Sequence, residues 1–305
     1  MTVLTEPFAF EFFRHGIAAA TMVGALCGLM GVYVVLRRMS YIGHGLSHSV
    51  FGGAVVSALI GWNFYIGAGA WGFLSALLIN ATARRRGIGA DAAIGIVTTA
   101  SFALGVALIS KSRSFTRNFE AALFGNILGV TSRDLAIIGG VSAVVAVAIF
   151  FGYKQLLFAT FDPELAPIYG VQATWVETAL ALALAATVVA SMNVVGVTLI
   201  AAALVVPPIT ARLLTDAFGR MLVLSTLIGA LCGFAGMFLS YEVDIASGAA
   251  IVLLNAALFV LVYGATAFQR SVARRPSRSL LPVSLSQRPS RPTRVVAETD
   301  AHSLG

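Results

Sequence analysis

Two histidines four positions apart are the residues of this sequence best suited to chemistry. His44 and His48 lie in the stretch 40–49, and they make up half of the four histidines in the chain. On an α-helix this spacing places both imidazoles on one face, about 6 Å apart along the axis. Neutral imidazole suits zinc, copper, iron and nickel. We therefore expect His44 and His48 to contact a divalent metal ion, with Ser47 as an accessory group on the metal path.

A packing role is the alternative for this pair. Histidine inside an apolar segment can serve as a hydrogen-bonded packing residue, and an HxxxH spacing alone is a weak signal. His15 stands beside Arg14, where an interfacial position is expected, and His302 has no evident role. The pair at His44 and His48 therefore gains its meaning from the element that carries it.

The composition indicates that this element lies in a membrane. Of 305 residues, 58% are hydrophobic and 11% are charged, and the mean hydropathy is +0.91. Soluble domains are about 45–50% apolar and about 25% charged. These values exclude a cytosolic enzyme and a disordered chain and favour a polytopic membrane protein. The sequence has no HExxH motif and no P-loop, so we do not expect an enzyme.

Apolar segments long enough to cross a bilayer recur along the chain, since a membrane helix needs about 20 residues. Only Asn193–Gly196 separates two of them, so one element is short or broken, or the two form a tight hairpin. The sequence predicts an all-α bundle of eight or nine transmembrane spans, at 16–36, 45–61, 64–82, 91–110, 134–153, 174–192, 197–213, 221–240 and 245–268.

The arginine clusters predict the orientation. Short cytoplasmic loops carry an excess of Lys and Arg, so we place 37–38, 84–86 and the C-terminal tail in the cytoplasm. Nine spans then put the N-terminus outside. The stretch 111–134 conflicts with this assignment, because it is expected outside and yet carries four basic residues against two acids.

The chain divides into a permease domain, 1–268, and a basic tail, 269–305. The tail holds seven arginines against Glu298 and Asp300, which accounts for most of the formal charge of +7. Because it is rich in Arg, Ser and Pro, the tail cannot bury enough apolar surface to adopt an ordered structure. We expect a disordered cytoplasmic tail near anionic lipid and no contact with nucleic acid.

A polar segment between two predicted spans is a candidate docking element. Asp162 suits an N-cap, Pro163 fits the first helical turn, and Glu164 favours the positive end of the helix dipole. Gly170 can end the helix. We expect a short helix on the cytoplasmic face, which is either a plain connector or a contact for a cytoplasmic partner.

Small residues and prolines predict how the spans pack. Gly24 and Gly28 have a small-xxx-small spacing, which lets helix backbones approach closely. Pro207 and Pro208 remove backbone donors inside an apolar segment. Such a break occurs in transport pathways and in simple packing kinks.

Over residues 6–268, the sequence resembles the membrane subunit of the manganese, zinc and iron class of ATP-binding-cassette importers. The resemblance rests on several motifs in order along the chain: Val34–Gly43, Leu46–Ser49, Asp91–Ile96, Leu123–Leu128, Phe161–Ala166, Gly196–Arg212 and Ser247–Ile251.

The resemblance implies a homodimeric, multi-pass permease of the cell membrane. Cytoplasmic ATPase subunits would drive it and an extracytoplasmic solute-binding protein would deliver the metal, so ATP acts on a partner and no tightly bound cofactor is expected. It also implies a coupling helix that docks on the ATPase. That role falls on Asp162, Pro163, Glu164, Leu165, Ala166 and Gly170.

The same resemblance bears on the metal. Members of this class commonly read Gly-Asp-Ala-Leu-Ser-His in the second span, and the Asp and His are associated with the metal path. His48 matches that histidine, whereas His44 stands in place of the aspartate. An imidazole in place of a carboxylate favours zinc over manganese, although manganese and iron also accept imidazole. The transported ion therefore stays open among zinc, manganese and iron.

Two other functions remain from the sequence alone. An ion-coupled secondary transporter would need acids in its spans, for which Asp91 and Glu177 are the available residues. A permease for a metal chelate or siderophore would use the same ATP-driven mechanism. Copurification of an ATPase subunit separates the first of these from an ATP-driven importer.

Overall fold

The computed structural model describes residues 6–83, 88–112, 125–162 and 165–273. Within these ranges the regular structure is entirely helical. Pro163, Glu164 and the tail from residue 274 lie outside the described residues. The all-α class predicted from the sequence is thereby confirmed.

Each of the nine predicted apolar segments falls in a helix. Seven of the described helices are long and apolar enough to cross a membrane, namely α2 (Glu11–Leu36), α4 (Phe64–Ala83), α5 (Ala90–Ser112), α7 (Ser132–Phe151), α9 (Ala173–Val195), α11 (Phe218–Val243) and α12 (Ser247–Ala273). The other two are α3 (Ser40–Leu59) and α10 (Ile200–Leu214). The short elements are η1 (Glu6–Ala9), η2 (Ile127–Gly129), α8 (Tyr153–Phe161) and η3 (Ala166–Tyr169).

Helices α3 and α10 are not among the seven long, apolar helices, each for a different reason. Helix α3 has 20 residues, but its histidines, serines and glycines lower its hydropathy. It compensates by packing against α4, α5 and α10. Helix α10 has only 15 residues, about 22 Å at the usual rise per residue, against about 30 Å of hydrocarbon. The short element expected around Asn193–Gly196 is therefore α10.

The tandem prolines lie inside α10 without breaking it. Pro208 has no N–H to donate to the carbonyl of Leu204. Gly31 of α2 packs directly on that oxygen, so closely that an added methyl group would overlap it. The close approach of α2 covers the carbonyl that the proline leaves free, and this accounts for a glycine at that position.

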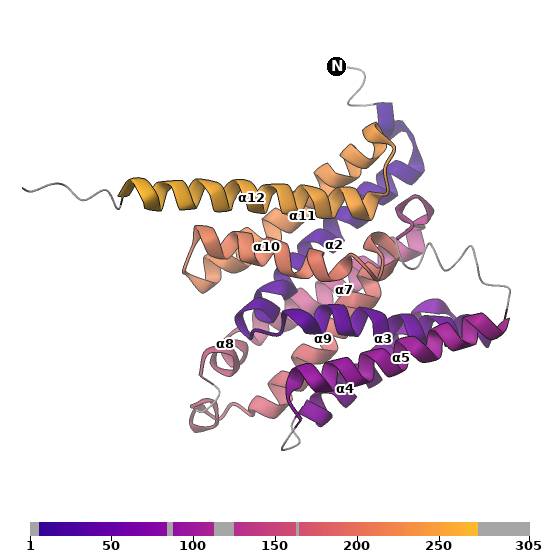
Figure 1. The fold of residues 1–305 in the computed structure, drawn as a ribbon, viewed down its shortest axis with the longest axis horizontal. Coiled ribbons are helices and arrows are strands. Elements are labelled where there is room, and N and C mark those ends of the chain that lie inside the picture. The colour runs from indigo at the N-terminus through magenta and orange to yellow at the C-terminus, as the bar shows by residue number, and fades with distance from the viewer. Residues whose placement is uncertain (1–5, 84–87, 113–124, 163–164, 274–305) are drawn as a thin grey trace, which may run out of the picture.

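Helix α2 lies at the centre of the bundle and contacts α11, α10, α7 and α9, while α3 packs with α4 and α5 (Figure 1). Figure 1 shows the start of α2 and the end of α12 at opposite ends of the bundle. Helix α8 lies at the same end as the C-terminal end of α12. The described chain thus begins at one end of the bundle and finishes at the other.

Glycines bring α2 and α11 into backbone contact. An added Cβ at Gly24 would overlap the carbonyl oxygen of Gly229, and one at Gly28 would overlap that of Ser225. The Ser225 hydroxyl donates to the Gly28 carbonyl at 2.6 Å. The tight packing predicted from Gly24 and Gly28 is confirmed, and Cys27 and Cys232 are free, buried side chains.

Candidate metal path and docking segment

The two histidines face each other on α3. The ring centroids of His44 and His48 lie 4.5 Å apart with an angle of 78° between the ring planes. The ring of His48 also meets Phe102 of α5 edge to face at 4.9 Å. The spacing of four residues has therefore produced the shared face that the sequence predicted.

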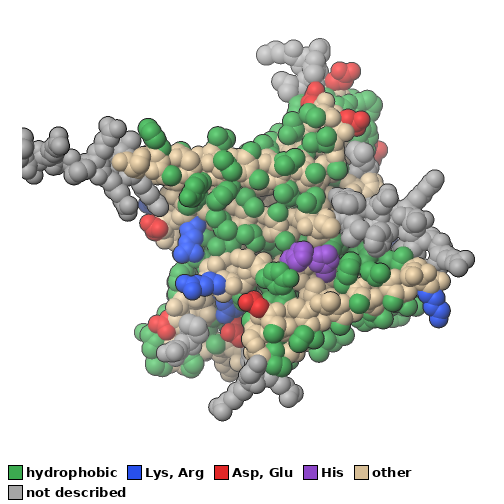
Figure 2. Space-filling model, viewed as in Figure 1, with side chains coloured by type: hydrophobic (Ala, Val, Ile, Leu, Met, Phe, Trp, Pro, Cys, Tyr) green, Lys and Arg blue, Asp and Glu red, His purple; other side chains and the backbone are tan. Residues whose placement is uncertain are grey.

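This face of α3 lies between α5 and α10. An added Cβ at Gly45 would meet Ile94 and Thr98 of α5, and one at Gly43 would meet Leu204 of α10. His44 and His48 occupy the arc between these two contacts, and both are partly exposed. Figure 2 shows histidine side chains at the surface near the middle of the bundle, with apolar side chains around them.

The polar atoms of the pair are only partly satisfied. Nδ1 of His48 is buried and has no hydrogen-bond partner among the described residues. Ser47, in contrast, is fully buried and its hydroxyl donates to the His44 carbonyl at 2.8 Å. The hydroxyl of Ser47 is thus engaged by the backbone of α3, and its place on the metal path stays a prediction.

One chain brings two candidate ligand side chains together at this place. Among the described residues there is no group of three or more His, Cys, Asp or Glu side chains that could hold a metal ion. His15 lies at the other end of the bundle from α8, near Glu11 and Ser132.

The docking segment follows α8. Asp162 ends α8, and its Oδ1 accepts the backbone N–H of Leu165 at 3.2 Å. The described remainder is the 3-10 helix η3, which ends at Gly170 with φ +73°, so the predicted stop is confirmed. The described part of the segment is thus a short 3-10 helix where a regular short helix was expected, because a helix that started at Asp162 would need an α-helical bond from the N–H that Pro167 lacks.

Apolar side chains of this segment point away from the bundle. Leu165, Ile168 and Tyr169 are 43%, 76% and 64% exposed. Ala166 is fully buried and anchors the segment, and Tyr169 stacks on Phe158 of α8 at 4.8 Å between ring centroids. A segment anchored by Ala166 thus carries exposed apolar side chains, which is an arrangement typical of a protein contact surface.

An arginine with a largely buried side chain lies beside this segment and was not among the predicted site residues. Arg37, read from the sequence only as an orientation signal, donates through Nη2 to the Ala159 carbonyl at 3.1 Å and to Glu177 at 3.4 Å. Its side chain is 12% exposed. The acid considered for ion coupling is therefore held in an ion pair, and Asp91 is exposed at the start of α5.

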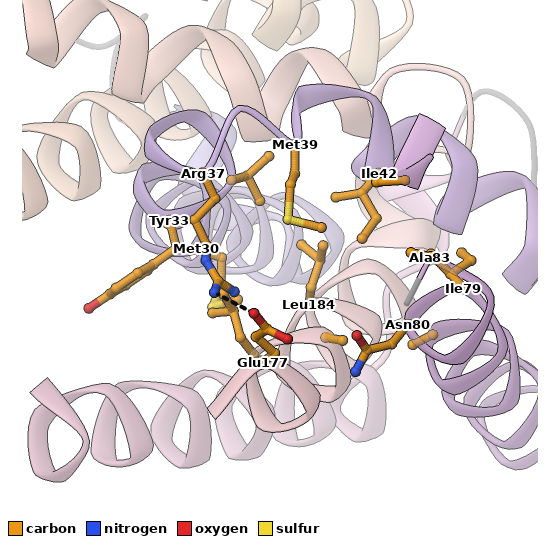
Figure 3. Close-up of a pocket in the computed structure, with 15 residues that line it drawn as sticks. Met30, Tyr33, Arg37, Met39, Ile42, Ile79, Asn80, Ala83, Glu177 and Leu184 are labelled. Carbon is orange, nitrogen blue, oxygen red and sulfur yellow. Dashed lines mark hydrogen bonds and ion pairs between the residues drawn. The ribbon is translucent and has the colours of Figure 1, made fainter. Parts of the chain in front are cut away.

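A cavity of about 420 Å³ adjoins this ion pair. Figure 3 shows Arg37 and Glu177 on one side of it and Asn80 and Ile79 of α4 on the other. Met39 and Ile42, at the start of α3, also line this cavity. The histidine pair does not line this cavity, so the two sites are separate.

Comparison with known proteins agrees with this architecture. The chain is 37% identical over 255 residues to the "Manganese transport system membrane protein MntC" of Halalkalibacterium halodurans, covering 84% of this chain and 87% of that protein. It is 36% identical over 258 residues to a "Probable iron transport system membrane protein" of Haemophilus influenzae, covering 85% and 95%.

Solved structures match as well. A chain of PsaBC from Streptococcus pneumoniae, solved in complex with Fab, superposes with a TM-score of 0.76 at 35% identity, covering 83% of this chain and 91% of that one. An inward-facing putative metal-chelate type ABC transporter gives a TM-score of 0.68 at 15% identity over 84% and 85%, which is a likeness of fold.

A family profile covers most of the chain. The ABC 3 transport family matches residues 9–265, which include the histidine pair, the docking segment and the nine helices of the predicted spans, up to the last turns of α12. The chain therefore belongs to the ABC 3 transport family, as its resemblance to the permease subunits of manganese, zinc and iron importers implied.

Proposed function

We propose that this chain forms the membrane pathway of an ATP-driven importer for divalent transition-metal ions, with His44 and His48 as the metal contacts. The observation that carries the proposal is the facing pair of imidazoles, with ring centroids 4.5 Å apart, on a partly open face of α3 near the middle of the bundle (Figure 2). Ionisable side chains at such depth are costly and mark ion pathways.

The open face argues for a homodimer. Partly exposed imidazoles against lipid tails would leave polar atoms unsatisfied, which is unfavourable in hydrocarbon. A second copy in an isologous dimer brings the same face against itself and encloses a polar path. Each copy contributes two imidazoles and waters complete the coordination, so the ion is held weakly enough to leave.

The docking segment transmits the movement of the ATPase to the membrane helices. A cytoplasmic ATPase subunit binds the exposed side chains of Leu165, Ile168 and Tyr169. ATP binding closes the ATPase subunits, the segment follows this motion, and the path around His44 and His48 opens to alternate sides. The ATP chemistry takes place in the partner, and this chain converts the movement into access for the metal.

This assignment fixes the orientation. The docking end of the bundle faces the cytoplasm together with Arg37, Arg38 and the tail, and the start of α2 faces outward, where an extracytoplasmic binding protein delivers the metal. Trp62 and Trp175 are 63% and 69% exposed and stand just before α4 and in the first turn of α9. Aromatic anchors of this kind belong at the two membrane interfaces.

Metal accumulation tests the function directly. Cells that lack the chromosomal copy of this gene should recover accumulation of zinc, manganese or iron when the intact chain is restored with its partner subunits. Each ion is supplied separately at low concentration and the cell content is measured by mass spectrometry. Equal content with and without the chain for all three ions would contradict the proposal.

Replacing His44 tests how the metal is selected. Asp in place of His44 exchanges a borderline nitrogen ligand for a hard oxygen ligand, which manganese prefers. We expect the zinc-to-manganese uptake ratio to fall about tenfold in His44→Asp, a free-energy difference of about 1.4 kcal/mol. Competitive uptake of the two ions measures the ratio. An unchanged ratio would show that His44 does not select the metal.

The docking role is tested at Ile168. Because this side chain is 76% exposed, Ile168→Asp leaves the fold intact but places a charge in the contact with the ATPase. An alanine scan of such contacts finds losses of about 2 kcal/mol or more at the central residues, so we expect copurification of the ATPase to drop at least about tenfold. Ile168→Val is the matched control and should retain the partner. Equal recovery in both variants would argue against docking here.

A further inference from the structure

Arg37 joins three helices at one point. Its Nη2 lies 3.1 Å from the Ala159 carbonyl oxygen of α8 and 3.4 Å from Glu177 Oε1 of α9. Ala159 belongs to the last turns of α8, just before Asp162, and Glu177 lies in the first turns of α9. A single guanidinium at the end of α2 therefore holds both flanks of the docking segment.

The charge of Arg37 makes this junction strong. Burial lowers the pKa of the guanidinium from its ordinary value, and the neighbouring Glu177 carboxylate raises it again. Arginine stays protonated in proteins, so the positive charge persists at the junction. The Arg37 side chain is 12% exposed and that of Glu177 34%, so solvent and salt screen their attraction only in part, and this favours movement of the three helix ends as a unit.

The connection from Arg37 to α3, the helix that carries His44 and His48, is short. Only Arg37, Arg38 and Met39 separate α2 from α3. Arg38 adopts a left-handed conformation with φ +56°, and the Met39 N–H donates to the Val34 carbonyl at 2.9 Å. A tight turn of this kind has little slack, so displacement of Arg37 is passed on to the first turn of α3, which leads into His44.

Space is available for that movement. Met39 and Ile42 of the turn and of α3 border the cavity of about 420 Å³ that Arg37 and Glu177 also line (Figure 3). Packed interiors resist displacement because side chains already touch. The cavity therefore leaves room beside the first turn of α3, between it and side chains of α4 and α9.

We propose that Arg37 is a positioning residue that couples the docking segment to α3, so that movement of the ATPase reaches the histidine pair. The inference rests on the proposed function, since it requires an ATPase at the docking segment and a metal at α3. It adds a residue that touches neither the metal nor the partner. Arg37 holds α8 and α9 to the turn before α3, and without it the two sites move independently.

The test measures ATP hydrolysed per metal ion transported, with the full complex in proteoliposomes. Arg37→Gln should keep the ATPase bound and hydrolysing ATP, while the ratio of ATP to metal rises about tenfold, within the usual range of coupling between sites. Arg37→Lys keeps the charge and should recover part of the coupling. Arg38→Gln removes an exposed arginine from the same turn and should behave as the unmodified complex.

Hydrogen exchange of residues 40–48 separates failure of this inference from failure of the proposed function. The unmodified complex should change its exchange there when nucleotide binds, and Arg37→Gln should lose that change whether or not metal is present. An unchanged ratio and exchange in Arg37→Gln would overturn the role of Arg37, as would a parallel loss of hydrolysis and uptake. Absence of ATPase binding or metal uptake in the unmodified complex would overturn the proposed function. Should Arg37→Gln not fold, Glu177→Gln removes the charge of the α9 partner while Arg37 keeps its bond to the Ala159 carbonyl, and a smaller rise in the ratio of ATP to metal is expected.

Discussion

Replacing His48 with alanine is expected to abolish metal uptake while the transporter still assembles. Disturbing an outer partner of a metal ligand already costs about 10–100-fold, so removing a ligand should cost at least about 100-fold. The ring of His48 lies between His44 and Phe102 on a partly open face. Its loss therefore leaves little cavity in the core, and the fold should be retained. Uptake of zinc and manganese into cells or proteoliposomes measures the effect.

His15 provides the matched control for this experiment. It lies at the far end of the bundle beside Glu11 and Ser132, so His15→Ala should leave uptake within about twofold, as is usual for changes away from such sites. Size-exclusion chromatography and copurification of the ATPase check assembly in both variants. Normal uptake by His48→Ala would remove the metal path from α3, and loss of assembly would assign His48 to packing.

The sequence was sufficient for features that depend on neighbouring residues. Apolar runs of about 20 residues identify membrane helices because the bilayer sets their length, and all nine predicted segments are helical. The shared face of His44 and His48 followed from the helical period alone. The stop at Gly170 followed from the left-handed conformation that glycine adopts readily.

Features that depend on distant residues could not be predicted in this way. Arg37 and Glu177 are 140 positions apart, and only the fold brings α2 and α9 together. Helix α8 was hidden because the apolar character of 134–153 continues past Gly152, where the structure ends one helix and begins another. The burial of Ala166 in the docking segment likewise depends on side chains from elsewhere in the fold.

The contact between α2 and α11 shows how packing between distant residues limits which residue types fit at a position. Gly24 and Gly229 lie so close that an added Cβ on either would overlap the carbonyl oxygen of the other. Backbone atoms cannot move aside as a flexible side chain can. Small residues at membrane helix contacts allow this approach, and in lipid the packing itself drives association. The core of the bundle therefore tolerates almost no added volume at Gly24.

Gly24→Leu is accordingly expected to prevent isolation of a folded chain, and Gly24→Ala to destabilise it by about 1–3 kcal/mol, the usual cost of overpacking. The matched control is Gly264→Ala in α12, where no atom lies within 4 Å of the added methyl group. There alanine should be neutral or stabilising by up to about 1 kcal/mol, because it favours the helix. Detergent-solubilised protein is followed by fluorescence-detected size-exclusion chromatography after heating. A monodisperse Gly24→Leu with the thermal stability of the unmodified chain would mean that α2 and α11 do not pack backbone to backbone, since no rearrangement of side chains can make room for leucine between two carbonyl groups.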